Sequence, residues 1–227
     1  MEIKVASVDS VIIYFDKTIS KNTSLKVKAA YKILKSLEDT ALIEIVPSYT
    51  SILITYDIFK YDINSIKVFL KELLKDLKIE EEKDLKVINV DVYYGDDVGF
   101  DLEKVALNAN ISIDEVIKIH SSKVYDVYAI GFLPGFAYLA AIDDRIITPR
   151  LKTPRKKIPK GSVAIADNQS AIYPQNSPGG WNILGKTTFE LFDKNLESLS
   201  PITIESRIKF NPITKEEFLK QGGQIEF

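Results

Sequence analysis

The stretch that decides the fold begins at residue 124 and reads VYDVYAIGFLPGFAYL through residue 139. Its first seven residues are rich in valine, tyrosine and isoleucine, as strands are, and the GFLPG that follows is typical of a turn into a second strand. The alternation of short strands with Gly and Pro turns continues down the chain and ends in predicted strands over 187–192 and 202–210. This pattern predicts a β-rich domain and favours a small closed barrel.

The N-terminal third predicts a compact α/β unit. Residues 11–15 suit a buried strand, and a helix follows with its cap among residues 22–24. Residues 43–46 and 52–56 predict an antiparallel pair of strands around Pro47-Ser48. The apolar stripe that marks the helix consists of Ala30, Ile33, Leu34 and Leu37.

A second helix and a charged run close this unit. After Asn64 or Ser65 as cap, apolar residues recur at helical spacing from Ile66 to Leu77. The run Glu80-Glu81-Glu82-Lys83-Asp84 has no apolar periodicity and is typical of an exposed linker. We therefore expect an α+β protein, with a small α/β N-terminal domain over residues 1–84 and a β-barrel domain over residues 85–227.

The second domain begins with a half-buried strand over residues 88–94, where apolar and polar residues alternate. Two short helices are predicted to start at Asp101 and Ser112. Ser112 and Glu115 have the spacing of a capping box.

Composition excludes several classes of protein. The chain has 227 residues, is 45% hydrophobic and 27% charged, and carries a formal net charge of -2. These values are typical of a globular protein and lack the basic excess of a nucleic-acid binder, so we expect no DNA or RNA partner. No stretch approaches the roughly 18 consecutive apolar residues of a membrane span, and no signal-peptide pattern opens the sequence. We expect no membrane partner and a cytoplasmic location.

Metal sites are also disfavoured. The absence of cysteine excludes disulfides and sulfur-ligated metals, and a single histidine, His120, leaves little room for an ordinary zinc site. Asp96, Asp97 and Asp101 lie close to glycines, which is typical of turn and cap residues. We expect no metal ion.

Residues 131–187 carry the functional signal. They hold six of the ten glycines, six of the nine prolines and three of the four arginines. Eight basic residues against three acidic ones give the segment a charge of +5 within an otherwise acidic chain. Because glycine lets the backbone approach a ligand and arginine presents a planar fork to carboxylates or phosphates, the segment predicts a site for a small anionic substrate. The alternative is that these charges, the lysines above all, are solvated loop residues.

Residues 180–187 read GWNILGKT and satisfy the phosphate-loop pattern G-x-x-x-x-G-K-T. That motif works where a strand feeds a glycine-rich turn that opens a helix. Here Ser177-Pro178-Gly179 precedes it and the strand-like residues 188–192 follow it. We therefore reject a nucleotide-binding loop and expect no cofactor-binding residue in this chain.

His120 has two interpretations. It follows Ile113, Val116 and Ile117 at i+7, i+4 and i+3, which places it on the apolar face of a helix near its C-terminus. A histidine there is often a packed, hydrogen-bonded residue. The alternative is that it points toward residues 131–187 as an acid, a base or a ligand donor.

Several motifs in this region closely resemble the family of the 5-oxoprolinase B subunits. That family also contains the sporulation kinase inhibitor KipI and the small-subunit half of allophanate hydrolase and urea carboxylase carboxyltransferase proteins. The resemblance covers the whole chain. It rests on residues 131–139, GFLPGFAYL, on the dipeptide Pro149-Arg150, and on the segments TPR at 153–155, IPKGSV at 158–163 and IYPQNSPGGW at 172–181.

The resemblance implies a cyclophilin-like barrel as the C-terminal domain and a multi-subunit enzyme. Family members pair with a second cyclophilin-like subunit of the C type, and in the oxoprolinase a third subunit of the A type joins them. The implied reaction is the ATP-driven opening of 5-oxo-L-proline to L-glutamate. ATP is then used by the complex and not bound by this chain alone, which is expected to be inactive by itself.

The resemblance also implies site residues. His120, Arg150 and Arg155 are the catalytic candidates, and Gln169, Tyr173, Ser177 and Trp181 are the substrate-binding candidates. An arginine is expected to hold the substrate carboxylate, while Gln169 and Tyr173 donate hydrogen bonds to the lactam. Ala166-Asp167-Asn168, where family members tend to carry glycine, and Lys186, where arginine is common, depart from the family pattern. These departures bear on the exact substrate.

Two other functions fit the same resemblance. One is a KipI-type inhibitor that uses the barrel surface to bind a histidine kinase. The other is the carboxyltransferase half of a urea carboxylase or allophanate hydrolase system. No biotin-attachment motif or ATP site is present in the sequence, so both enzyme functions require partner subunits.

Overall fold

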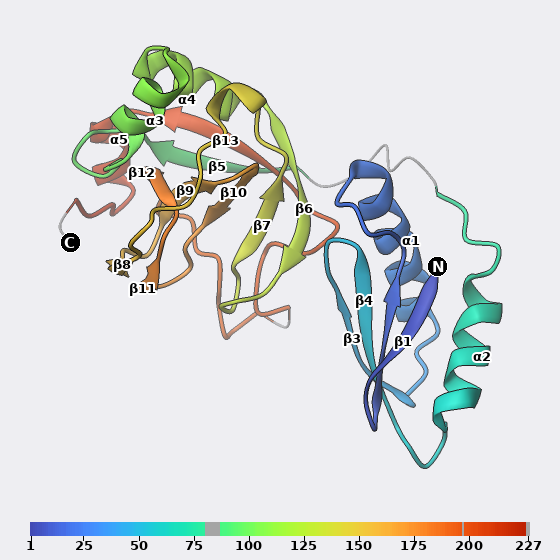
Figure 1. Ribbon diagram of the computed structural model, residues 1–227. Helices are drawn as coiled ribbons and strands as arrows, with labels where there is room; N and C mark the ends of the chain where they lie inside the picture. Colours follow the sequence, from blue (N-terminus) through green and yellow to red (C-terminus); the bar gives the residue numbers. More distant parts are fainter. Residues whose placement is uncertain (80–86, 197, 226–227) are drawn as a thin grey trace. The chain divides into compact units, whose positions relative to one another are not determined.

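The computed structural model describes residues 1–79, 87–196 and 198–225, and it divides the chain into two compact units, Met1–Asp84 and Leu85–Phe227 (Figure 1). The predicted linker Glu80–Asp84 lies outside the described residues. No described helix combines the length and the apolar character that crossing a membrane requires.

The first unit is an antiparallel sheet with two helices packed on it. Its strand order is β1-β2-β4-β3, and Figure 1 shows α1 and α2 beside the sheet. The two helices and the sheet share one apolar core, because Val11 and Ile13 of β2 and Ile52 and Ile54 of β4 are fully buried against them. The elements are β1 (Glu2–Ser7), β2 (Ser10–Tyr14), α1 (Lys21–Ser36), β3 (Leu42–Pro47), β4 (Ser51–Tyr56) and α2 (Ile63–Leu74).

The predicted elements of this unit are present, with three corrections. Strand β1 was not predicted. Ile3 and Val5 alternate with Glu2 and Lys4, but the run is short and its residues are largely exposed at the sheet edge. The cap of α1 is Ser20, whose side chain accepts from the Thr23 amide, and the cap of α2 is Asp62 in a reciprocal capping box with Ser65. Both helices therefore begin earlier than their apolar stripes indicate.

The second unit is a closed seven-stranded barrel in the order β10-β7-β6-β13-β5-β12-β9, and β9 pairs with β10 to close it. Strands β5 and β13 run parallel although 120 residues separate Asp91 from its partner Asn211. A two-stranded sheet of β8 and β11 lies beside the barrel (Figure 1). The strands are β5 (Val87–Tyr93), β6 (Val124–Ile130), β7 (Ala137–Ala140), β8 (Arg155–Ile158), β9 (Ser162–Ala166), β10 (Gln169–Ile172), β11 (Ser177–Gly179), β12 (Asn182–Lys186) and β13 (Arg207–Ile213).

Helices cover part of this barrel. Asp101 and Ser112 precede the first residues of α3 (Leu102–Ala109) and α4 (Ile113–Ser122), as predicted, and α5 (Lys215–Lys220) follows the last strand. Only half of the predicted capping box forms at Ser112, whose hydroxyl accepts from the Glu115 amide.

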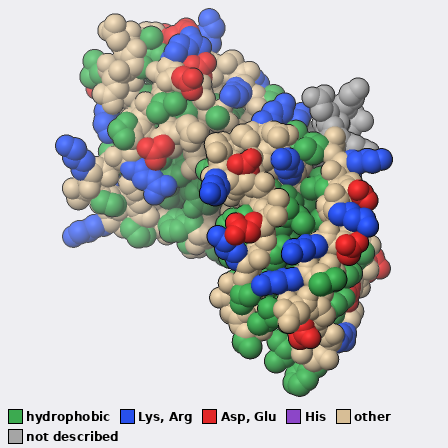
Figure 2. Space-filling model, turned by 45° about the vertical axis from the view of Figure 1, so that its right-hand side comes forward, with side chains coloured by type: hydrophobic (Ala, Val, Ile, Leu, Met, Phe, Trp, Pro, Cys, Tyr) green, Lys and Arg blue, Asp and Glu red, His purple; other side chains and the backbone are tan. Residues whose placement is uncertain are grey.

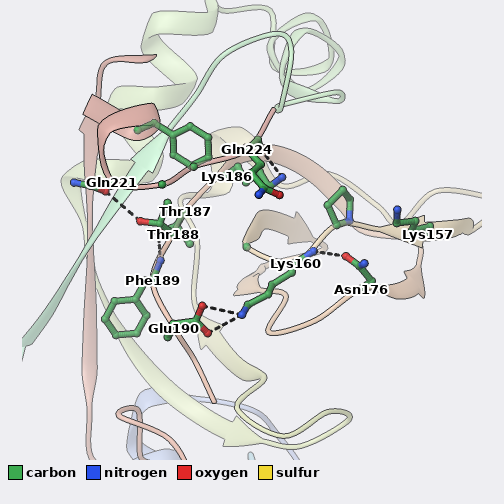
Figure 3. Close-up of a pocket in the computed structure, with 15 residues that line it drawn as sticks. Lys157, Lys160, Asn176, Lys186, Thr187, Thr188, Phe189, Glu190, Gln221 and Gln224 are labelled. Carbon is green, nitrogen blue, oxygen red and sulfur yellow. Dashed lines mark hydrogen bonds and ion pairs between the residues drawn. The ribbon is translucent and has the colours of Figure 1, made fainter. Parts of the chain in front are cut away.

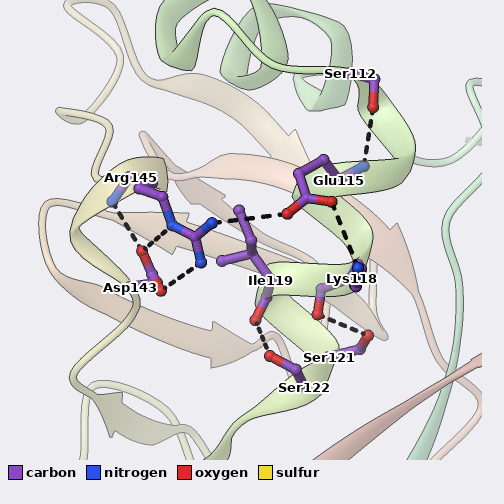
Figure 4. Close-up of polar contacts among 8 residues, drawn as sticks. All are labelled: Ser112, Glu115, Lys118, Ile119, Ser121, Ser122, Asp143 and Arg145. Atoms are coloured by element: carbon purple, nitrogen blue, oxygen red, sulfur yellow. Dashed lines mark hydrogen bonds and ion pairs between the residues drawn. The ribbon is translucent and has the colours of Figure 1, made fainter.

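Arg145, an exposed residue of the short 3-10 turn η1 (Asp144–Ile146), forms an ion pair with α4 (Figure 4). Arg145 lies 3.7 Å from Glu115 of α4 and donates two hydrogen bonds to Asp143, at 2.9 and 3.0 Å. These hydrogen bonds lower the pKa of Asp143 to about 2. One of the three arginines in the basic segment therefore has a structural ion pair.

Two predicted strands near the C-terminus need correction. Residues 187–192 form no strand. The Thr187 amide still bonds to the Gly161 carbonyl at 2.9 Å, next to the Lys186–Ser162 pair, but the Thr187 hydroxyl accepts from the Phe189 amide at 3.1 Å and turns the chain out of the ladder. The strand predicted over 202–210 begins only at Arg207. On the face shown in Figure 2, acidic side chains are interspersed among the basic ones, as the small net charge indicates.

Candidate functional site

Four aromatic side chains gather on one side of the barrel wall, and we call them the aromatic face: Phe136, Tyr138, Tyr173 and Trp181. Phe136 lies at the centre. Its ring centroid is 4.8 Å from that of Tyr138, 5.3 Å from Tyr173 and 5.9 Å from Trp181. The Tyr173 and Trp181 contacts are edge-to-face, a preferred geometry for aromatic pairs. Phe136, Tyr173 and Trp181 are buried, so the aromatic face is a packed cluster in which each ring restrains the next.

Small residues on two neighbouring strands make room for these rings. Register pairs Ala171 of β10 with Tyr138 of β7 and with Ala164 of β9, so the three side chains lie on the same face of the sheet. Ala164 and Ala171 are fully buried and belong to the same apolar cluster as the aromatic face. Larger side chains in this row would occupy the space of the rings.

Arg150 lies over the aromatic face. Its guanidinium carbon is 5.7 Å from the centre of the Trp181 ring, within cation–π range. The side chain is 58% exposed, and its nearest acidic group is the exposed Asp167, with Nε 3.8 Å from Oδ2. A surface pair at that distance holds the arginine only weakly, so its planar fork can receive an anionic ligand.

The backbone on both sides of Arg150 is fastened to the barrel. The side-chain amide of Asn182 donates to the Pro149 carbonyl at 3.0 Å, and the backbone amide of Leu151 donates to the Gly180 carbonyl at 2.7 Å. Asn182 is completely buried and accepts in turn from Lys104 of α3 at 2.8 Å. These contacts place Arg150 over Trp181 before any ligand arrives, as a preorganised site requires.

Tyr173 supplies a hydroxyl at the edge of the aromatic face. Burial raises its pKa to about 12, an effect that the positive charge of Arg150 partly offsets, so the phenol keeps its proton at neutral pH. The ring fits only because residue 179 is glycine: a Cβ there would lie 2.5 Å from the Tyr173 oxygen. Gly179 therefore sets the position of this hydroxyl.

The remaining substrate-binding candidates differ in placement. Gln169 pairs with Ala140 and Ala166, so strand alternation places it on the same side of β10 as Ala171. Ser177 is nearly buried in β11, and its hydroxyl donates to the neighbouring Pro178 carbonyl at 3.3 Å. The strand register thus brings Gln169 to the aromatic face, whereas the hydrogen bond of Ser177 is local.

The structure pairs Arg155 with a buried acid, and its catalytic role stays a prediction. Its guanidinium donates to Asp101 at 2.9 Å and faces the Trp181 carbonyl at 3.5 Å. The second oxygen of Asp101 accepts from the Ile183 amide at 2.8 Å, and only 5% of the Asp101 side chain is exposed. One terminal nitrogen of Arg155 is therefore paired with a buried carboxylate, which holds Asp101 beside β12.

The structure places His120 as a packed, hydrogen-bonded residue, and its catalytic role likewise stays a prediction. The residue is fully buried, and its two ring nitrogens lie 2.8 Å from the Tyr94 hydroxyl and 2.9 Å from the Ser170 hydroxyl. The ring stacks on Phe210 at 4.6 Å. Burial lowers its pKa to about 3, so it is neutral at physiological pH. Ser170 points away from the aromatic face, because it alternates with Ala171 along β10.

Sequence reasoning missed four residues of this site. Phe136 and Tyr138 lie within the quoted motif at 131–139, but a strand pattern does not say which aromatic faces a ligand. Asp101 has the sequence context of a cap residue; it does precede α3, yet its carboxylate makes no cap hydrogen bond. No sequence pattern marked Asn182 as a site residue, because its side chain bonds to residues 17 to 78 positions away along the chain. Among the described residues, no group of acidic or histidine side chains could hold a metal ion.

Comparison with known proteins places this chain in a family. The sequence model described as "Carboxyltransferase domain, subdomain C and D" matches residues 1–202. The chain is 31% identical to the B subunit of 5-oxoprolinase from Bacillus subtilis, over 92% of this chain and 91% of that protein. It is 34% identical to the B subunit of 5-oxoprolinase from Haemophilus influenzae, over 78% of this chain and 81% of that protein.

Solved structures share the fold. The crystal structure of TTHA0988 matches 90% of this chain with a TM-score of 0.79 and 29% identity. The match covers only 40% of the length of TTHA0988. A conserved uncharacterized protein from Pyrococcus horikoshii, PH0987, matches with a TM-score of 0.57 and 38% identity, over 96% of this chain and all of that one.

Proposed function

The chain belongs to the carboxyltransferase domain family, subdomain C and D, and on that premise we propose that it is the B subunit of an ATP-dependent 5-oxoprolinase complex. The reaction converts 5-oxo-L-proline, ATP and water to L-glutamate, ADP and phosphate. Relatives named as 5-oxoprolinase B subunits, matched over most of their length, support this assignment.

The single observation that carries the proposal is the placement of Arg150 over the Trp181 ring, fastened from both sides by barrel hydrogen bonds. A small flat ring that bears a carboxylate matches this arrangement, because the ring packs on aromatic side chains while the carboxylate binds the guanidinium fork. The protonated Tyr173 hydroxyl and the Gln169 amide supply neutral hydrogen bonds to a lactam.

Binding groups on the aromatic face outnumber groups that move protons. Both of its tyrosines have a pKa raised by burial, and the carboxylate nearest to Arg150, that of Asp167, is exposed and paired with it. His120 lies in the barrel interior. We propose that partner subunits supply the ATP site and the proton-transfer groups, so that this chain is half of a shared site and inactive alone.

The partners that we propose are a second subunit with a cyclophilin-like barrel, of the C type, and a third subunit of the A type. We assign the barrel of this chain to the same cyclophilin-like class. The exposed Phe132, whose ring meets Phe136 edge-on at 5.4 Å, extends the aromatic face toward solvent and marks one edge of the surface that a partner would cover.

A second function, the carboxyltransferase half of a biotin-dependent enzyme, is favoured by the description of the matching family itself. In that case Arg150 would hold a carboxylated substrate in the same place. The two functions differ in whether 5-oxoproline stimulates ATP hydrolysis.

The deciding experiment uses the chain co-expressed with its A-type and C-type partners. ATP hydrolysis and glutamate release are measured with and without 5-oxo-L-proline, with the isolated chain assayed in parallel. We expect 5-oxoproline-dependent release of ADP and glutamate in equal amounts from the complex and none from the chain alone. An assembled complex that hydrolyses ATP without regard to 5-oxoproline would overturn the assignment.

A further inference from the structure

A second pocket lies in the barrel unit, on residues that the proposed function does not use (Figure 3). Its volume is about 660 Å³, which falls in the range of small-molecule sites. Lysines from three different segments line it: Lys157 of β8, Lys160 of the following turn and Lys186 at the end of β12. The aromatic face contributes none of its residues to this pocket.

The lysines are incompletely neutralised. Three lysines against one acidic residue, Glu190, leave a charge of +2 on the pocket lining. Figure 3 shows the Lys160 side chain reaching across to Glu190, where its Nζ lies 2.8 and 2.7 Å from the two carboxylate oxygens. That pair satisfies Lys160, and the surplus charge belongs to Lys157 and Lys186.

Burial and a neighbouring positive charge both disfavour the charged form of Lys186. Its Nζ donates to the Gln224 carbonyl at 2.7 Å, which leaves two of its three N–H groups for another acceptor. Burial lowers the pKa of Lys186, and the nearby charge of Lys157 lowers it further. No ion pair of either lysine with a described acidic residue relieves this repulsion.

A hydroxyl donor is available beside the lysines. Thr187 accepts from the Phe189 amide at 3.1 Å, so its own proton remains for another acceptor. The Thr187 backbone approaches Gly161 so closely that a Cβ at residue 161 would lie 2.2 Å from the Thr187 carbonyl oxygen. Gly161 also adopts φ +80°, which favours glycine, and it therefore keeps this wall of the pocket in place.

Lys186 and Thr187 are the last two residues of the G-x-x-x-x-G-K-T match. Most of the segment is strand β12, and residues 187–196 that follow it contain no helix, so it is not a phosphate loop. Its lysine and threonine nevertheless converge on one pocket, because the chain leaves the barrel ladder directly after Lys186.

From this geometry we propose that the pocket binds a small oxyanion, namely inorganic phosphate or the phosphate group of a monoester, through Lys157, Lys186 and the Thr187 hydroxyl. Two ammonium groups and one hydroxyl around a +2 lining match a tetrahedral dianion. The inference does not depend on the identity of the ligand at the aromatic face.

The test is a calorimetric titration of the full chain at constant ionic strength with inorganic phosphate and, separately, with glycerol phosphate. Variants Lys157→Gln and Lys186→Gln remove the two unpaired charges. Lys156→Gln is the matched control, since it removes the same charge from the adjacent position of β8 and does not line the pocket. Circular dichroism verifies that each variant is folded.

We expect saturable binding that weakens by about tenfold in Lys157→Gln and in Lys186→Gln, and that is unchanged in Lys156→Gln. Tighter binding of glycerol phosphate than of phosphate identifies a monoester as the ligand, and equal or weaker binding identifies free phosphate. Absence of saturable binding of either probe, or equal affinity in all three variants, overturns the proposal. Arg150→Ala should leave phosphate binding intact while impairing the 5-oxoproline reaction, so the two proposals fail separately.

Discussion

The guanidinium carbon of Arg150 lies 5.7 Å from the centre of the Trp181 ring, in a loop that hydrogen bonds fasten to β12 and to Gly180. The two residues are 31 positions apart and share no strand, so the contact depends on the closed barrel. It joins a cation to a flat apolar surface, the two features that a small ring carrying a carboxylate requires.

Arg150→Lys in the assembled complex should raise the KM for 5-oxoproline by about tenfold, with a smaller effect on kcat, because lysine keeps the charge but loses the planar fork. Steady-state kinetics with ATP saturating measures the change. Lys152→Ala, an exposed charge in the same loop, is the control and should leave KM unaltered. Equal KM values for wild type and Arg150→Lys would remove Arg150 from the substrate site.

Gly179→Ala should displace Tyr173, because the added Cβ would lie 2.5 Å from its hydroxyl and 2.7 Å from the Cδ1 of Ile158. We expect a loss of about 1–3 kcal/mol in the free energy of unfolding, as overpacking produces, together with a raised KM. Urea denaturation gives the first and kinetics the second. Gly131→Ala is the matched control, since a Cβ there meets no atom within 4 Å.

Asp101→Asn should destabilise the barrel by about 2–3 kcal/mol, since it leaves the partly buried Arg155 without its carboxylate partner. The comparison is Glu190→Gln, which breaks the exposed pair with Lys160 and should cost at most about 1 kcal/mol. Equilibrium unfolding in urea measures both variants. If the two losses are equal, the Asp101–Arg155 pair is not the structural anchor described above.

His120 should make stability depend on pH. Its pKa is about 3 in the folded protein and about 6.5 in an unfolded chain, so the unfolded state binds the extra proton between these values. The stabilisation is complete above pH 6.5 and is lost as pH falls toward 3, at up to about 1.4 kcal/mol per pH unit.

Urea midpoints measured from pH 8 to pH 5 test this behaviour. His120→Gln should be less stable than wild type at pH 8, and the difference should shrink as pH falls toward 5. Lys118→Gln, an exposed change on the same helix, should keep the wild-type slope. Parallel curves for wild type and His120→Gln would show that His120 does not titrate on unfolding.

Local elements were predictable because their information is local. The apolar stripes of α1 and α2 and the alternation in β4 each follow from residues that contact one another along the chain. The strand predicted over 187–192 is absent for the opposite reason: the composition suits a strand, but the Thr187 side chain takes up the Phe189 amide that a ladder would use. Strand propensity cannot report that competition.

By itself, the sequence determined the barrel-type strand pattern, the segment at 131–187 that carries the site, and the family. These depend on composition, period and motif. Only the tertiary structure decided which arginine is available to a ligand and which is already paired. Arg150 and Arg155 look alike in sequence, each beside a proline, but closure of the barrel brings Asp101 to Arg155 and Trp181 to Arg150. Such partners lie 54 and 31 residues away, and no local pattern specifies a contact of that range.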